Sequence, residues 1–302
     1  MIARGPIDPV HDRQGGAAYV EFLIAFLPLF TFFLGLVQWS LMSAADLVVQ
    51  HAASRAVRAA IVVIDDEESR YDGADRLQID SDGSAEVRDP LATILGLDCP
   101  TPLAGLGTPR GGPRLAAIRQ AASFPLLAVS PSFDQLYETD SVRTALDDPG
   151  CRASMGAGAY NAAAMSVTFP DGPHSSSFRS SFAYGDQVTT RVTYAFHCGV
   201  PLINRLMCES YPALRYGDLG ILVDNILRDL ADGRIDHNTA RQRMDRIQLS
   251  RDRHARDGDA AEELDSAASS ELLNFTSLRG ARYKLLQGEA TMPLQAARYA
   301  YE

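Results

Sequence analysis

The sequence lacks the short motifs that mark most enzymes and metal-binding domains. Its four cysteines include no C-x-x-C pair, so zinc-finger and thioredoxin-type spacings are absent. The six histidines show no H-E-x-x-H spacing, and the chain has no G-x-S-x-G motif and no P-loop. We therefore expect no metal, no organic cofactor and no catalytic site. The prediction is a protein that is not an enzyme and that acts through its packing surfaces.

Positive charge is also scarce. Lys284 is the only lysine, and the net charge of the chain is -10, which argues against binding to nucleic acid. Most of the negative charge lies in residues 65–89, which hold ten acidic residues and three arginines, a net charge of -7. A run of acidic residues usually stays in solvent. We therefore expect an exposed acidic insert at this point of the chain.

One long apolar run lies near the N-terminus. No charged residue occurs from Phe22 to Ala45, and about 36 Å of helix is enough to cross a bilayer core of about 30 Å. Pro28 lies inside the run, where membrane helices tolerate proline. Beyond Ala45, small apolar residues recur with a helical period as far as Ala60. We predict one helix over residues 17–64, with its first half in lipid or packed on like helices.

Glu21 stands at the edge of this run, and three interpretations of the N-terminus are open. A secretory signal peptide would be cut after small residues such as Ser43-Ala44-Ala45, but the predicted helix continues through that site. A plain membrane anchor explains the length of the run and leaves Glu21 without a role, although an ionisable residue at that depth is costly and needs a partner. In the third interpretation the chain is cut before the helix, and the new terminal amine is that partner.

The third interpretation rests on a resemblance. The string RQGGAAYVEFLIAFLPLF, followed by an Ala/Arg-rich helix, resembles the TadE/TadG-like pseudopilin family of the tight-adherence (Tad, type IVc) pilus system. The resemblance implies cleavage by a prepilin peptidase after Gly16, a mature chain that begins at Ala17, and Glu21 as its fifth residue. It also implies that Glu21 pairs with the amine of a neighbouring subunit and sets the axial register of assembly. The alternative is an unprocessed Glu21 carboxylate that reaches the cytoplasmic interface.

Three segments of the remaining chain alternate apolar and polar residues as strands do, namely 164–169, 187–196 and 281–292. We predict that they form an antiparallel sheet packed on the second half of the helix, with a flexible hairpin connection between the first two. Short helices are expected at 114–124 and 141–148, and a turn at 155–161. Charged helices are expected between residues 217 and 273, with Gly233 as a helix stop. The predicted fold class is therefore α+β and pilin-like.

The cysteines are even in number, which suits two disulfides outside the cytoplasm and four free thiols inside it. Cys198 and Cys208 flank a short loop, and a bridge between them would stabilise the fold by roughly 3 kcal/mol. Cys99 and Cys151 would then form the second pair, although the sequence alone allows three connectivities. The loop also holds four apolar residues, Leu202, Ile203, Leu206 and Met207. We expect them to cover the end of the sheet, with a role at the membrane surface as the alternative.

These expectations combine into one hypothesis. The chain comprises a leader (residues 1–16), a transmembrane and amphipathic helix (17–64) and an extracytoplasmic α+β domain (65–302). It is expected to be a structural minor pseudopilin or pilus-associated subunit of a Tad-type assembly that serves adhesion, surface contact or secretion. The expected partners are other pilus or pseudopilin subunits, the prepilin peptidase and the bacterial inner membrane, with the C-terminal domain in the periplasm. The alternative is a membrane-anchored periplasmic binding or scaffold protein outside any filament.

Overall fold

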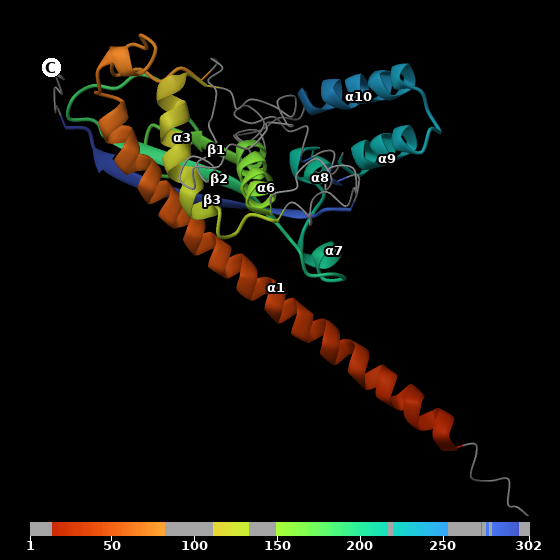
Figure 1. The fold of residues 1–302 in the computed structure, drawn as a ribbon. Coiled ribbons are helices and arrows are strands. Elements are labelled where there is room, and N and C mark those ends of the chain that lie inside the picture. The colour runs from red at the N-terminus through yellow and green to blue at the C-terminus, as the bar shows by residue number, and fades with distance from the viewer. Residues whose placement is uncertain are drawn as a thin grey trace, which may run out of the picture.

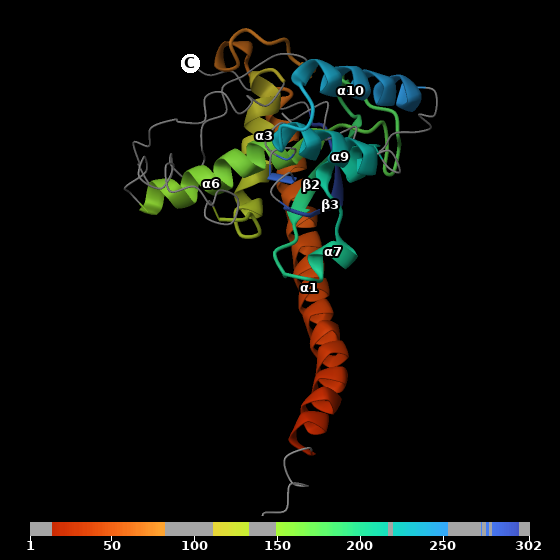
Figure 2. The same cartoon turned by 90° about the vertical axis from the view of Figure 1, so that its right-hand side faces the viewer.

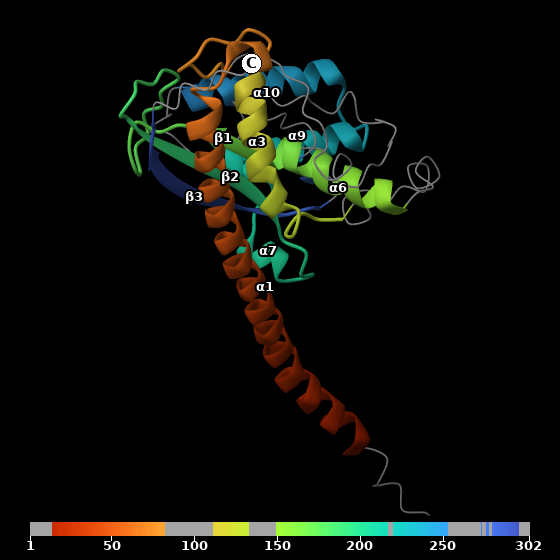
Figure 3. The same cartoon turned by 60° about the vertical axis from the view of Figure 1, so that its left-hand side comes forward.

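A computed structural model gives the fold of the chain. It describes residues 14–81, 111–132, 149–216, 220–252, 273, 276–277 and 280–295. One long helix, α1 (Gln14–Val63), dominates the molecule. Its second half packs on a small domain, and its first half projects away from that domain (Figures 1, 2 and 3). The predicted long N-terminal helix is confirmed.

Three antiparallel strands form the sheet, in the order β1-β2-β3. They are β1 (Met165–Thr168), β2 (Gln187–His197) and β3 (Tyr283–Pro293). The three predicted strands and the α+β class are therefore confirmed. Val192 in the central strand pairs with Val167 on one side and with Gly288 on the other. β2 is buried along nearly all of its length. α1 packs on one face of the sheet, and the connection between β1 and β2 contacts Arg191 on the other face.

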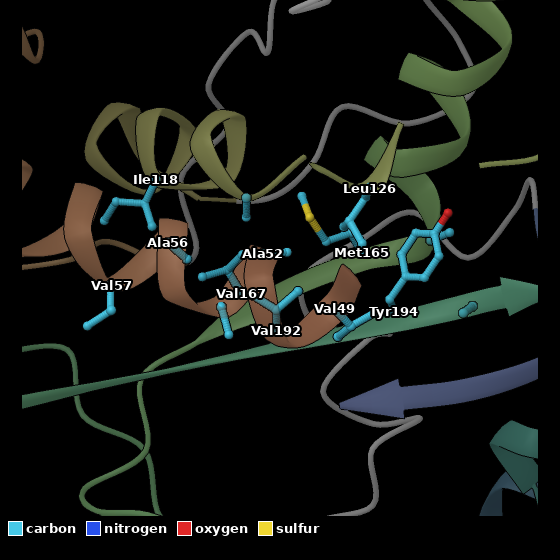
Figure 4. Close-up of a cluster of buried hydrophobic side chains, with 14 of the residues drawn as sticks. Val49, Ala52, Ala56, Val57, Ile118, Leu126, Met165, Val167, Val192 and Tyr194 are labelled. Atoms are coloured by element: carbon cyan, nitrogen blue, oxygen red, sulfur yellow. The ribbon is translucent and has the colours of Figure 1, made fainter. Parts of the chain in front are cut away.

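The face of α1 that meets the sheet is built from small side chains. Its buried members are Ala45, Val49, Ala52, Ala53, Ala56, Val57 and Ala60. Figure 4 shows this face lying against Val167 and Val192 of the sheet. Helix α3 (Pro113–Leu126) packs beside α1 and adds Ile118 and Leu126 to the same core. Because its side chains are short, the α1 backbone comes close to β3: a Cβ atom at Gly288 would lie 2.7 Å from the carbonyl oxygen of Val49.

The start of the predicted acidic insert is packed against the domain, whereas Glu68, Asp72, Asp75 and Asp80 are exposed as expected. Within the described residues 65–81, the exposed insert is therefore wrong for Asp65 and Asp66. Asp65 and Asp66 are buried. The Tyr184 hydroxyl donates to the Asp65 carboxylate over 2.6 Å, and the Glu67 N–H donates to Asp66 Oδ1 over 2.9 Å. A short 3-10 helix, η2 (Glu68–Arg70), follows. Side-chain and backbone donors in these contacts replace the water that the acidic residues would otherwise bind.

Arg114 explains why this segment folds back. The last carbonyls of a helix have no partner within the helix, and the Arg114 guanidinium donates to the carbonyl of Val63 at the end of α1. It also donates to the carbonyls of Asp66, over 3.0 Å, and of Ala74, over 2.9 Å. The guanidinium lies over the ring of Tyr71, 4.6 Å from its centroid. Arg114 is 1% exposed, and this burial lowers the pKa of its side chain.

Residues 155–161 lie in helix α6 (Pro149–Ala164), so the predicted turn is wrong. Two glycines suggested the turn, but tertiary contacts outweigh their weak helix preference. The Tyr160 hydroxyl donates to the carbonyl of Ala195 on β2, and Ser130 Oγ donates to Asn161 Oδ1 over 2.6 Å. The helix predicted at 114–124 is confirmed as α3, and the one predicted at 141–148 lies outside the described residues.

The connection between β1 and β2 is held against the sheet, which corrects the flexible hairpin that we predicted. Arg191 on β2 donates to Glu289 on β3 over 2.5 Å and to the carbonyl of Ser175 in the connection over 2.7 Å. The backbone N–H of His174 donates to the same Glu289 carboxylate over 2.9 Å. Burial alone would raise the pKa of Glu289, but these hydrogen bonds and the charge of Arg191 lower it.

A helical pair forms a second, smaller apolar cluster. Helix α8 (Tyr211–Tyr216) leads to α9 (Gly220–Ala231) and α10 (His237–Asp252). Val223 and Ile226 of α9 pack on Ala240 and Ile247 of α10. Gly233 has φ +69° in the turn between them, as expected for a helix stop. The apolar side chains of Ala240 and Ile247 on α10 are therefore covered by α9.

Candidate membrane and assembly site

The first half of α1 carries a broad apolar surface that the described part of the chain leaves uncovered. Tyr19–Val63 is long and apolar enough to cross a membrane, and its most apolar 18-residue window has none of its residues buried. Its exposed large side chains include Phe22, Leu23, Ile24, Leu27, Leu29, Phe32, Phe33 and Trp39. A soluble monomer rarely exposes an apolar patch of this extent. We therefore expect lipid or other apolar helices to cover it.

Glu21 lies at the start of this surface. Gly16 and Ala17 already have helical backbones, so Glu21 follows Ala17 by one helical turn, about 6 Å along the axis. The Glu21 side chain is exposed, and no ion pair to it forms among the described residues. The helix thus brings the three sequence-predicted residues together at one end of the apolar surface. Cleavage after Gly16 and the pairing of Glu21 stay predictions.

The apolar half of α1 is continuous despite its proline. Pro28 has no N–H to donate to the carbonyl four residues earlier, but helical structure continues on both sides of it. Thr31 Oγ1 donates to the carbonyl of Leu27 over 2.8 Å, which satisfies the hydroxyl within the helix. Phe22, Phe26 and Phe30 stack along one face, with ring centroids 5.3 Å and 5.4 Å apart. The three rings therefore form a continuous aromatic strip along this part of the helix.

A loop closed by a disulfide contacts α1 near the end of this surface that adjoins the domain. The Sγ atoms of Cys198 and Cys208 lie 1.99 Å apart, and the loop between them contains the short helix α7 (Asn204–Met207). We call residues 198–208 the foot. The Val200 N–H donates to Gln38 Oε1 over 3.2 Å. Gln38 is fully buried although it lies in the apolar run, so the foot covers a polar group of α1.

Two of the four apolar residues in the foot point away from the protein. Ile203 is buried and Met207 is half-buried, but Leu202 and Leu206 are 65% and 76% exposed. The expectation that all four cover the end of the sheet is therefore wrong for the two leucines. The predicted pair of Cys99 and Cys151 lies outside the side chains that the structure describes.

The comparison with protein families concerns this same helix. Residues 16–58 match the family model described as TadE-like protein. Over this segment the chain is similar to TadE-like proteins. No curated protein and no solved structure matches the chain. The TadE-like match covers the exposed half of α1 and most of the half that packs on the sheet, and it suggests a Tad pilus-associated protein with a helix suited to membrane anchoring.

Outside this segment the described residues meet mainly through apolar and aromatic contacts. Among the described residues, no group of three or more His, Cys, Asp or Glu side chains is placed to hold a metal ion. His197 ends β2, and its ring lies edge-on to Tyr283 with 5.9 Å between centroids. Burial lowers the pKa of the His197 imidazole. The adjacent Cys198 sulfur is bonded to Cys208, so it offers no thiol to this histidine.

Proposed function

We propose that this TadE-like protein is a structural minor pseudopilin or pilus-associated subunit of a Tad-type (type IVc) pilus or secretion assembly, acting in adhesion, surface contact or secretion. One observation carries the proposal: a helix with an uncovered apolar half begins beside Gly16 and Ala17 and places Glu21 at the start of that half. The family match begins at the same glycine. The protein acts by packing its helix and presenting its domain, and it turns over no substrate.

The role of Glu21 follows from the medium around it. An isolated carboxylate in lipid is strongly disfavoured, and a paired one much less so. Cleavage after Gly16 by a prepilin peptidase creates an amine on Ala17, which is mostly protonated at neutral pH. The amine of one subunit and Glu21 of the next then neutralise each other inside the apolar layer. Because the pair forms at one height only, it sets the axial register of neighbouring helices.

The domain lies outside the cytoplasm in this proposal. The Cys198–Cys208 disulfide supports that placement, because structural disulfides persist in oxidising compartments. The first half of α1 then crosses the inner membrane of a bacterium, with the sheet, α3 and α9–α10 on the periplasmic side. Assembly moves the same apolar helix from lipid to the surfaces of neighbouring pilus subunits.

The mature N-terminus tests the processing step. We expect mass spectrometry of the protein from its native host to find a chain that starts at Ala17, and we expect Gly16→Val to leave the leader attached. An intact Met1 in the parent protein would favour a plain anchor. A chain that starts at Asp46 would indicate a signal peptide and would rule out both membrane-resident interpretations.

The assembly step is tested separately with Glu21→Ala. We expect this variant to insert in the membrane at the parental level and to be lost from sheared pilus fractions, because the terminal amine of its neighbour has no carboxylate to meet. Glu68→Ala is the matched control, since Glu68 is an exposed acid in the domain. Normal recovery of the Glu21→Ala protein in the pilus fraction would refute the role of Glu21.

A second candidate is a membrane-anchored periplasmic binding or scaffold protein. It is favoured by the size of the domain, because the sheet, the foot and α9–α10 all lie beyond the residues that match the family. This candidate expects the protein to remain in the inner-membrane fraction when pili are sheared from the cells, whatever residue stands at position 21.

A further inference from the structure

The foot lies at the end of the domain from which the first half of α1 projects. In Figure 1, α7 lies beside α1 on the side of the sheet from which the first half of the helix projects, and Figures 2 and 3 agree. Leu202 and Leu206 are its most exposed apolar residues. Arg205, between them, is also exposed. This surface has no cover from the described part of the chain.

The foot is held both to the sheet, through residues at its base, and to α1, through Val200. At the base, the Cys198 N–H donates to the carbonyl of Arg282 over 2.8 Å, and Glu209 pairs with Tyr283 on β3. The disulfide joins the two ends of the loop. Two residues after Cys198, the Val200 N–H donates a hydrogen bond to the buried Gln38 of α1. The foot therefore cannot swing away from α1 without breaking the sheet contacts or the hydrogen bond to Gln38.

The contact with Gln38 fixes the height of the foot along the membrane helix. Gln38 follows Phe22, the first residue of the uncharged run, by sixteen positions. That spacing is about 24 Å of helix, and a bilayer core is about 30 Å thick. Gln38 therefore lies within a few ångströms of the far edge of the core when Phe22 lies at the near edge. Trp39, 62% exposed at the same level, is the residue type that concentrates at such an edge.

We propose that the foot inserts Leu202 and Leu206 into the domain-side leaflet of the membrane that α1 crosses, with lipid as the occupant of its exposed apolar surface. This inference rests on the membrane anchoring in the proposed function. It adds a second membrane contact, made by the domain itself. The foot holds the domain at a fixed distance and rotation above the bilayer while the protein resides there.

Lipid fits this surface better than a protein partner does. The apolar surface of the foot is continuous in height with the uncovered surface of α1, and two leucines on one short turn are far smaller than a standard protein interface. Arg205 between the leucines suits the phosphates of lipid headgroups.

The test uses tryptophan fluorescence of the full chain in vesicles of phosphatidylethanolamine and phosphatidylglycerol, with or without bromine atoms on the acyl chains. The single tryptophan, Trp39, is replaced in Trp39→Phe, and Leu206→Trp is added to it. We expect roughly a twofold loss of emission in brominated vesicles, because an interfacial apolar segment sinks about 5–10 Å into the boundary. Leu222→Trp in the same background is the matched control, since Leu222 is an exposed leucine on α9, and its emission should not change.

Trp39 in the parent protein reports on membrane anchoring separately from the insertion of the foot. If bromine quenches Trp39 in the parent and leaves the indole of Leu206→Trp unquenched, the foot does not enter lipid and the inference is overturned while membrane anchoring stands. If Trp39 itself is unquenched, the anchoring has failed. A photoactivatable phenylalanine at position 206 gives an independent outcome: cross-links to lipid support the inference, and cross-links to a second copy of the chain overturn it. A nonreducing gel confirms that each variant keeps its disulfide.

Discussion

Gly288 sets the distance between α1 and the sheet, and replacing it by alanine tests how strictly that distance is fixed. The new Cβ would lie 2.7 Å from the carbonyl oxygen of Val49, 2.8 Å from its carbonyl carbon and 2.9 Å from the Cα of Gln50. All three atoms belong to the backbone of α1, so no side-chain rotation relieves the clash. The shortest contact must lengthen from 2.7 Å to about 3.4 Å to become ordinary van der Waals contact.

The cost of that shift can be bounded. A gap of 0.5–1 Å forfeits about a quarter to a half of the dispersion energy of each contact along the interface. Overpacking a well-filled core typically costs about 1–3 kcal/mol, and the rigid backbone on both sides favours the upper end of that range. We therefore expect Gly288→Ala to lower the free energy of unfolding by about 2–3 kcal/mol. For a domain of this size the corresponding fall in melting temperature is roughly 5–10 °C.

Thermal unfolding of the full chain in detergent, followed by circular dichroism, measures this fall. Gly172→Ala is the matched control, because Gly172 has no neighbour within 4 Å of a built Cβ, and its free energy of unfolding should stay within about 0.5 kcal/mol of the parent. A Gly288→Ala protein as stable as the control would show that α1 lies farther from β3 than the structure places it. The close approach at Val49 would then be wrong.

Two further perturbations test the polar parts of the core. Arg114→Met removes the donors to the carbonyls of Val63, Asp66 and Ala74, and it should cost roughly 3–5 kcal/mol in unfolding free energy. Arg114→Lys should recover only part of this, because it lacks the planar fork, and a Met variant as stable as the parent would contradict the role of Arg114 at the end of α1. Acid should also destabilise the sheet. Burial lowers the pKa of His197 below its ordinary 6.5, so the unfolded chain binds more protons just below pH 6.5, and stability that is complete above that pH is lost as the pH falls toward the folded-state pKa. Melting temperatures at pH 8 and pH 5 should differ more for the parent than for His197→Gln, and an equal difference would contradict the assignment.

Periodicity was enough to predict the main elements of the fold. The small apolar residues of α1 and the alternation in β1, β2 and β3 reflect burial on one face. Such a pattern can be recognised within a short segment of the sequence. The short loop between Cys198 and Cys208 and the even number of cysteines likewise pointed to a disulfide between these two residues. The roles of Gly16, Ala17 and Glu21 came from the resemblance of the stretch around them to the TadE/TadG-like family, and they stay predictions. Each of these signals involves residues close to one another in the chain.

The features that the sequence did not reveal depend on distant residues. Arg114 meets a carbonyl 51 positions earlier, and Gln38 meets Val200, 162 positions later. A single arginine or glutamine is not part of any sequence pattern that predicts such a distant partner. The glycines of α6 and the two buried residues at the start of the acidic run, Asp65 and Asp66, misled for the same reason, since tertiary contacts outweighed local composition. Gly288 is the exception, because an isolated glycine inside a predicted strand often marks a close approach of two backbones.

The continuity of α1 links its two surfaces mechanically. The helix has no glycine or proline between Gly35 and Val63, and such helices curve gently without a hinge. Its first half presents large apolar side chains to lipid or to neighbouring helices, and its second half is locked to the sheet by small residues and by the approach at Gly288. A neighbour that fixes the rotation of the first half therefore fixes the direction in which the domain faces. Gly288→Ala should consequently disturb how the domain is presented as well as its stability, because the domain can reorient only by repacking its core on α1.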